Sequence, residues 1–175
     1  NEFVLDQFTP PKTVLQNAIS RLKTKVFWMS NFDAGQLENP FTTTETISGD
    51  KFVLFTHKYT TLQRASKRIV VFASPFQLEI ARRGGGVYMG DGTFQHVPAM
   101  FKQMDTIHAM VGEVVFPVAF VFMEERTTQA YEILFTQLKD RGITIKTFMA
   151  DYEKGSRVAL KSVYGNGVQI KGCLF

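Results

Sequence analysis

Two aspartates stand at matching places in two segments that have the pattern of β-strands. Asp91 lies two residues after Met89 and four after Val87. Asp151 lies two residues after Met149. Because side chains alternate between the two faces of a strand, each aspartate continues one face of its segment. If the two strands are parallel neighbours, the carboxylates meet near the strand ends, where open α/β sheets place their ligand sites.

Such a pair of carboxylates has a definite chemistry. Two unit charges about 4 Å apart repel by roughly 4 kcal/mol at an effective dielectric constant near 20, so the pair needs a bound cation or a proton. Hard oxygen ligands suit Mg²⁺ or Mn²⁺. Two such ions can clamp the attacking and leaving oxygens in phosphodiester cleavage and transfer. A structural interpretation also remains, in which Asp91-Gly92 forms a turn and Asp151 caps the following helix.

The hydrophobic pattern predicts the elements that carry these aspartates. Strands are expected at 87–94, 102–111, 116–123, 144–151 and 168–174, and helices at 75–82, 128–141 and 153–164. The first of these helices should begin at a capping box formed by Ser74 and Gln77. Three strands with short connections form an antiparallel meander, and two right-handed helical crossovers add parallel strands. If the fourth strand pairs with the first, the five-stranded mixed sheet has the order 3-2-1-4-5, and both crossover helices cover one face.

The part of the chain before this pattern is expected to be an extension of mixed α and β structure, residues 1–65. An apolar stripe predicts a helix over 12–26. Short β-type runs at 52–55 and 69–72 predict a hairpin with a long, basic loop. Residues 66–175 then form the α/β domain with the two aspartates.

The positive charge of the chain lies in its first half. Residues 1–90 carry 11 basic and 7 acidic side chains, a surplus that equals the net charge of +4 for the whole chain. A cluster of cations can neutralise the phosphates of a nucleic acid, although a solvated loop is the simpler interpretation. The candidates for phosphate contacts are Lys58, Arg64, Lys67 and Arg68.

The composition argues against a membrane or secreted protein. The longest apolar run, residues 114–123, is about half as long as the roughly 20 residues that cross a bilayer as a helix. The first residues, NEFVLDQF, have no charged region followed by an apolar stretch, so no signal peptide is expected. The single cysteine, Cys173, excludes a disulfide within the chain and fits a reducing, intracellular compartment.

Ordered motifs over about residues 66–175 resemble the Mutator-like element (MULE) transposase domain. They are Asp91-Gly-Thr-Phe94, then Pro98 and Phe101-Lys-Gln-Met-Asp-Thr-Ile-His108, then Phe148-Met-Ala-Asp151-Tyr-Glu153-Lys154, then Ile170-Lys-Gly172-Cys173-Leu-Phe175. The resemblance implies an RNase H-like fold with a DDE triad of metal-binding acids, of which Asp91 matches the first and Asp151 the second. The third, a glutamate on a helix after the fifth strand, is expected beyond Phe175, so the domain is expected to be truncated before its last helix.

The same resemblance implies an activity. The intact protein would be a DDE transposase that performs metal-dependent DNA cleavage and strand transfer with two Mg²⁺ or Mn²⁺ ions. Its partner would be the DNA of transposon ends, bound by a homo-oligomeric complex in the nucleus. The alternative is a domesticated, transposase-derived protein that binds DNA or regulates without catalysis. A third interpretation is a small α/β module whose acids serve only as caps and turns.

Three further residues have two interpretations each. Glu153 is placed to support a metal ligand, although the helix dipole alone favours an acid at the start of a helix. His108 matches the Thr-Ile-His segment of the family and is either a supporting residue near the metal or a hydrogen-bonded strand residue. Cys173 is half of the family's Cys-x-x-His pair, or else a small buried residue.

Overall fold

The computed structural model describes residues 45–46, 48–93, 97, 100–150 and 153–172. These residues belong to one compact unit within residues 39–175. The elements in chain order are β1 (Val53–Thr60), β2 (Ser66–Phe72), α2 (Pro75–Arg83), β3 (Val87–Thr93), β4 (Gln103–Val111), β5 (Val114–Met123), α3 (Thr128–Asp140), β6 (Thr147–Ala150), α4 (Lys154–Tyr164) and β7 (Gln169–Gly172). The helix predicted at 12–26, Asp151 and Cys173 lie outside the described residues.

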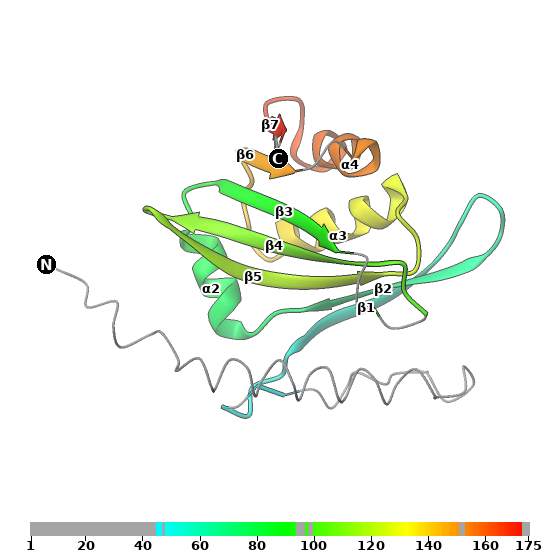
Figure 1. The fold of residues 1–175 in the computed structure, drawn as a ribbon, viewed down its shortest axis with the longest axis horizontal. Helices are drawn as coiled ribbons and strands as arrows, with labels where there is room; N and C mark the ends of the chain where they lie inside the picture. Colours follow the sequence, from blue (N-terminus) through cyan, green and yellow to red (C-terminus); the bar gives the residue numbers. More distant parts are fainter. Residues whose placement is uncertain (1–44, 47, 94–96, 98–99, 151–152, 173–175) are drawn as a thin grey trace, which may run out of the picture. The chain divides into compact units, whose positions relative to one another are not determined.

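Seven strands form one mixed sheet in the order β1-β2-β5-β4-β3-β6-β7 (Figure 1). Strand β3 pairs antiparallel with β4 and parallel with β6, and β7 adds to β6 in parallel. The predicted α/β class is confirmed, but the predicted number of five strands is wrong. Strands β1 and β2 extend the sheet beyond β5, because β2 pairs antiparallel with β5 along its apolar half. Strand β1, which was assigned to the extension, therefore belongs to the same sheet.

A tight turn joins β1 to β2, so the prediction of a long loop is also wrong. The Thr61 N–H donates to the Ala65 carbonyl oxygen at 2.9 Å, and Arg64 adopts a φ of 59°. A three-residue loop whose last residue is left-handed is a common way to close a hairpin. The basic segment is therefore mostly strand, and the hairpin turn projects from the edge of the sheet (Figure 1).

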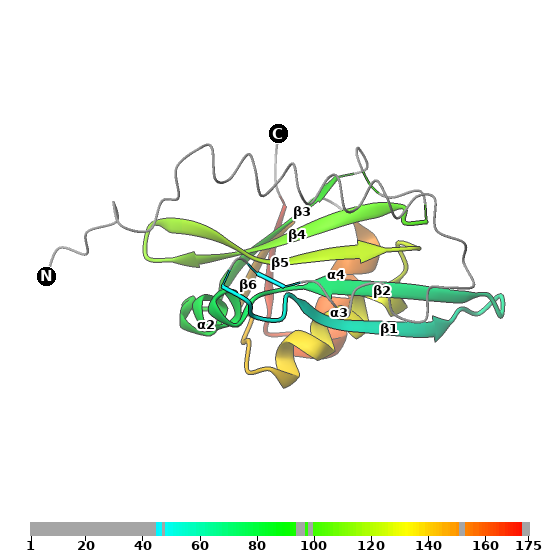
Figure 2. The same ribbon diagram turned by 90° about the horizontal axis from the view of Figure 1, so that it is seen from below.

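The three helices of the described region cover the same face of the sheet (Figure 2). The predicted capping box of α2 is confirmed: Ser74 Oγ accepts from the Gln77 N–H at 3.1 Å, and Gln77 Oε1 accepts from the Ser74 N–H at 2.9 Å. Helix α3 begins where Thr127 Oγ1 accepts from the Ala130 N–H at 3.2 Å. Gly165, with a φ of 88°, ends α4. Both crossover helices thus pack on one side of the strands, as the expected topology required.

The main core lies between these helices and the sheet. Its largest fully buried side chains include Tyr88, Phe135, Phe148, Ile69, Met123, Leu134, Leu138 and Leu160. The rings of Phe135 and Phe148 meet edge to face with centroids 5.7 Å apart, and Tyr131 stacks on Phe135 at 6.2 Å. Close packing of this kind fixes α3 against β6 and leaves little freedom for the residues between them.

The opposite face of the sheet carries a cluster of phenylalanines. Phe72 and Phe122 meet edge to face at 5.7 Å, and Phe101 lies 5.4 Å from Phe122. Phe52 contacts both Phe72 and Phe120. The many phenylalanines of the chain thus supply apolar surface on both sides of the sheet.

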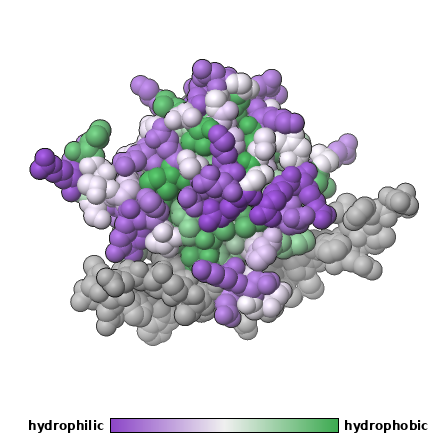
Figure 3. Space-filling model, turned by 180° about the vertical axis from the view of Figure 1, so that it is seen from behind, coloured by the Kyte–Doolittle hydropathy of each residue, from purple (hydrophilic) through white to green (hydrophobic). Residues whose placement is uncertain are grey.

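The surface of the helix side is mostly hydrophilic, with hydrophobic residues gathered toward the centre of the view (Figure 3). Large apolar side chains with high exposure in the described ranges are Leu62, Phe76, Val114, Val115 and Val158. In the same ranges, no helix has the length and apolar character needed to cross a membrane.

Candidate functional site

Asp91 lies inside strand β3 and is exposed. Because β3 continues to Thr93, the interpretation of Asp91-Gly92 as a turn is wrong. The carboxylate has no hydrogen-bond or ion-pair partner among the residues that the structure describes. Gly90 and Gly92 line a pocket on the helix side, so strand alternation directs Asp91 to the opposite face of the sheet.

Asp151 lies outside the described residues, but the elements on either side of it are defined. Strand β6 ends at Ala150 and runs parallel to β3, with Met149 level with Met89. The cap position of α4 is occupied by Glu153, so the interpretation of Asp151 as the helix cap is wrong. The extent of β3 excludes the turn interpretation of Asp91, whereas Asp151 lies outside the described residues.

Glu153 is held by two side chains on the helix side of the sheet. Arg126 donates from Nε to Oε1 at 2.9 Å, and its Nη2 lies 2.8 Å from Oε2. Tyr131 Oη donates to Oε2 at 2.7 Å. A bidentate guanidinium–carboxylate pair is strong and geometrically specific. The hydrogen bond to Glu153 raises the pKa of Arg126 above its ordinary value, so the guanidinium stays charged.

A second carboxylate, Asp105 of β4, is buried next to this ion pair. Asp105 is 7% exposed, and Gln103 Nε2 donates to its Oδ2 at 2.7 Å. The same amide nitrogen lies 2.7 Å from Tyr131 Oη, which connects the two carboxylates through one network. Burial raises the pKa of Asp105 to about 7, and the negative charge of Glu153 adds to this, whereas the interactions with Tyr131 and Gln103 lower it.

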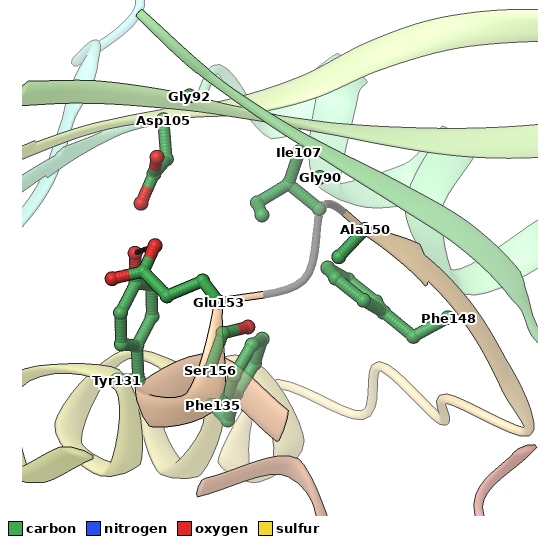
Figure 4. A pocket seen from close by; sticks show the side chains of 10 residues that line it. All are labelled: Gly90, Gly92, Asp105, Ile107, Tyr131, Phe135, Phe148, Ala150, Glu153 and Ser156. Carbon is green, nitrogen blue, oxygen red and sulfur yellow. Dashed lines mark hydrogen bonds between the residues drawn. The ribbon is translucent and has the colours of Figure 1, made fainter. Parts of the chain in front are cut away.

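These polar groups border a small pocket between β3, β4, α3 and the start of α4 (Figure 4). Its inner volume is about 20 Å³, enough for about one water molecule. The carboxylates of Asp105 and Glu153 face each other across this space (Figure 4). The wall consists of Gly90, Gly92, Asp105, Ile107, Tyr131, Phe135, Phe148, Ala150, Glu153 and Ser156.

The two glycines beside Asp91 are required by close packing on the helix side. A Cβ on Gly92 would lie 2.7 Å from Oδ1 of Asp105. A Cβ on Gly90 would lie 2.8 Å from Cζ of Phe148. Real Cβ atoms do not come so close to other heavy atoms, so larger residues would displace the carboxylate or the ring. In Gly90-Asp91-Gly92 the acid is therefore exposed on one face of the sheet. The two glycines face the other side, where neighbouring atoms leave no room for a side chain.

His108, Glu153 and Cys173 are the remaining predicted site residues outside the basic segment. His108 lies in β4 directly opposite Met89, half-buried, and alternation puts it on the same sheet face as Asp91. It has no hydrogen-bond partner in the described part of the chain. Glu153 is at the α4 cap, on the helix side. Cys173 lies outside the described ranges.

The four basic candidates divide into two pairs. Lys67 lies 3.4 Å from Glu125, and Arg68 lies 3.6 Å from Glu124. These two cations are therefore neutralised within the protein. The other two, Lys58 and Arg64, are exposed on the hairpin and have no acidic partner among the described residues.

Sequence reasoning missed Asp105, Gln103, Tyr131 and Arg126 as members of one network. One signal was available: Gln103 and Asp105 are polar residues at alternate positions, on the same face as the buried Ile107 and Ala109. Polar side chains on the inward face of a strand require partners, because burial without hydrogen bonds is unfavourable. The identity of those partners was not visible, since they come from segments about 20 to 50 residues later.

Neither a protein-family model, nor a curated protein, nor a solved structure matches this chain. Among the residues that the structure describes, no group of three or more histidine, cysteine, aspartate or glutamate side chains is arranged to hold a metal ion. A function is therefore inferred from the sequence motifs and from the geometry around Asp91 and Glu153.

Proposed function

We propose that residues 66–175 form part of the RNase H-like catalytic domain of a DDE transposase of the Mutator-like type. In this proposal Asp91 and Asp151 bind the Mg²⁺ or Mn²⁺ used for DNA cleavage and strand transfer. The observation that carries it is the parallel pairing of β3 with β6, in which Met89 is level with Met149. Asp91 follows Met89 by two residues within β3, and Asp151 follows Met149 by two residues in the sequence, so the proposal puts both acids at the same end of this strand pair.

The strand order supports the RNase H-like assignment. Strands β3, β4 and β5 form an antiparallel meander, and β6 and β7 continue the sheet in parallel on the other side of β3. The two crossover helices share one face of the sheet. This is the arrangement that the motif resemblance implies. The carboxyl ends of adjacent parallel strands are also where open sheets place their ligands.

The donor chemistry of Asp91 fits a hard divalent cation. Its carboxylate is exposed and has no protein partner in the described region, so it does not have to leave an ion pair to bind a metal. Such ions, when bound, polarise phosphodiester oxygens and stabilise the attacking and leaving groups. The role of this chain is to hold the carboxylates on strands that are fixed by the central sheet. DNA of transposon ends, homo-oligomeric assembly and a nuclear location belong to the same proposal.

Calorimetric titration with Mn²⁺ tests the proposal. The parent chain, Asp91→Asn and Asp151→Asn should be compared with Asp140→Asn, which removes an exposed carboxylate from the last turn of α3. We expect the two site variants to bind Mn²⁺ at least about tenfold more weakly than the parent, because each loses a charged ligand. The Asp140 variant should match the parent. An equal response from all four proteins would exclude the metal site.

A transposase-derived DNA-binding protein without catalysis is the second candidate. The exposed, unpaired Lys58 and Arg64 on the hairpin favour it, because they are free to meet phosphates in the described structure. This candidate predicts salt-dependent binding to duplex DNA that is the same with and without Mn²⁺. Binding that depends on the metal and on Asp91 would instead favour the catalytic proposal.

A further inference from the structure

We propose that the hairpin of β1 and β2 is a DNA-binding arm. Leu62, at the turn, enters the minor groove of a duplex as an apolar wedge between base pairs, and Lys58 and Arg64 contact phosphates nearby. The inference rests on the proposed function, from which it takes DNA as the partner, and it adds a contact outside the metal site.

Leu62 is the most exposed large apolar side chain of the described residues, with 97% of its surface accessible. Hydrogen bonds around Thr61 define the turn that presents it. The Thr61 N–H donates to the Ala65 carbonyl oxygen at 2.9 Å, and the Ala65 N–H donates to Thr61 Oγ1 at 3.2 Å. The Arg64 N–H donates to the Thr61 carbonyl oxygen at 2.9 Å. This closed turn holds Leu62 away from the sheet, where a partner can contact it.

Arg64 has a backbone conformation that favours glycine. Its φ of 59° lies in the left-handed region, and among the described residues it is the one non-glycine residue with a positive φ. An arginine in such a conformation at an exposed turn points to a use for its side chain. Proteins that bind the minor groove combine arginine or lysine with an apolar wedge such as leucine, which separates two base pairs. Arg64 and Leu62 supply this combination two residues apart.

The hairpin carries positive charge and no acid. Residues 51–78 contain no aspartate or glutamate. The glutamates at 124–125, which lie beside the hairpin, are paired with Lys67 and Arg68. The charges of the two exposed cations, Lys58 and Arg64, are therefore not neutralised by the described part of the protein. A surface of this kind attracts the phosphates of a duplex.

The strand register puts Lys58 on the same face of the sheet as Asp91. A row of directly opposite residues runs from Asp91 of β3 across β4 and β5 to Phe72 of β2. Residues opposite one another share a face, and every second residue of a strand lies on that face. Arg68, four residues before Phe72, is therefore on the Asp91 face, and so is Lys58, its partner in β1.

The hairpin extends past the end of the sheet at which β3 ends. Thr93, the last residue of β3, is level with Val70 of β2 across the same two strands. Strand β2 begins four residues earlier, at Ser66, so the hairpin continues for about 13 Å before its turn (Figures 1 and 2). The strand spacings place the turn about 30 Å from Asp91, which is less than one turn of B-DNA, about 34 Å. One duplex can therefore reach both Asp91 and the hairpin.

The base of the hairpin is anchored to the rest of the domain. Tyr59 is buried in the main core, and Gln129 Nε2 of α3 donates to the Thr60 carbonyl oxygen at 3.3 Å. Insertion of a side chain between base pairs has to overcome their stacking, which costs free energy. An anchored arm supports such a wedge because its functional side chain is held by packed secondary structure.

The experiment measures the bending and binding of a DNA duplex of about 30 base pairs by the full chain. Energy transfer between dyes at the two duplex ends reports bending. Fluorescence anisotropy at several salt concentrations reports the affinity and its salt slope. Both are measured in EDTA, so that they do not depend on a metal at Asp91.

The parent should bend the duplex by about 20° or more. Leu62→Ala should abolish the bend and weaken binding by up to about tenfold, because the apolar contact is lost. It should keep the salt slope of the parent, because Lys58 and Arg64 remain. Leu62→Met keeps a long apolar side chain and should bend DNA as the parent does. Phe76→Ala is the matched control: it removes a side chain of α2 that is 63% exposed and should leave bending and affinity unchanged.

Parental bending by Leu62→Ala, or duplex binding by the parent without a bend, would overturn the inference. Failure of the parent to bind the duplex would overturn it as well, and self-association that depends on Leu62 would then assign the turn to an interface between copies of this chain. If the parent bends DNA through Leu62 but binds no Mn²⁺ through Asp91, the arm stands and the catalytic proposal fails. If the parent binds Mn²⁺ through Asp91 and Leu62→Ala behaves as the parent does, the inference alone fails.

Discussion

Replacement of Asp105 by asparagine should change how the stability of the protein depends on pH. Asp105 is buried in β4, and the amide of Gln103 donates a hydrogen bond to its Oδ2 at 2.7 Å. Asparagine has nearly the same shape and keeps an oxygen that can accept that hydrogen bond. It differs by having no charge at any pH. The substitution therefore isolates the free energy of ionising a buried carboxyl.

The magnitude follows from the pKa of Asp105, which rises from 3.8 to about 7 mainly because of burial. The folded state thus holds the proton more tightly than the unfolded state does. The stability contributed by the protonated carboxyl is complete below pH about 4 and is lost as the pH rises through about 7. A shift of this size corresponds to about 4 kcal/mol in total. Between pH 5 and pH 8 the loss is roughly 3 kcal/mol.

Urea unfolding of both proteins at half-unit intervals from pH 5 to pH 8 measures the effect. The stability of Asp105→Asn relative to the parent should increase with pH by roughly 3 kcal/mol over this range. Other groups with shifted pKa values, such as the partly buried Glu124, contribute to both proteins and cancel in the difference. Parallel stability curves for the two proteins would refute the reasoning, because they would mean that Asp105 ionises equally easily in the folded and unfolded states.

Three other substitutions test separate parts of the structure. Gly92→Ala should lower the free energy of unfolding in urea by about 1–3 kcal/mol, because the new Cβ meets a buried carboxylate oxygen; Gly85→Ala, with open space around it, should have little effect. Ser74→Ala removes a capping-box bond and should lower the same free energy by about 1 kcal/mol. The double variant Lys58→Ala/Arg64→Ala should keep the thermal midpoint and reduce the salt slope of duplex binding, measured by fluorescence anisotropy, by up to about 2; an unchanged slope would exclude hairpin contacts with phosphates.

Features that depend on residues close together in the sequence were predictable. The α/β class followed from apolar strands that alternate with amphipathic helices in the second half of the chain. The capping box of Ser74 and Gln77 was visible because its bonds join residues three apart. The end of α4 at Gly165 was equally local, because the positive φ of this residue is open mainly to glycine.

The predictions failed for features of the fold that are determined by contacts between distant segments. A long loop was predicted for the hairpin of β1 and β2 because a basic segment separates the two short β-type runs. In the structure Lys67 and Arg68 lie within the strand and pair with Glu125 and Glu124. Pairing of β2 with β5 then enlarges the sheet to seven strands. No local sequence pattern indicates that two segments about 50 residues apart will pair.

The hydrogen-bond network around Glu153 was also not predictable, because it joins segments that are far apart in the sequence. Its members come from β4, from the segment before α3, from α3 and from the start of α4. Gln103 and Asp105 were noticeable as polar residues on an inward strand face, but Arg126 and Tyr131 had no sequence feature that linked them to Glu153. Only the packing of α3 beside α4 brings these side chains together.

Anomalous diffraction from crystals of this chain grown with Mn²⁺ tests the proposed metal site most directly. We expect a manganese peak on the sheet face opposite the helices, about 2.1 Å from carboxylate oxygens of both Asp91 and Asp151. A peak only in the pocket between Asp105 and Glu153, or no peak near Asp91, would contradict it.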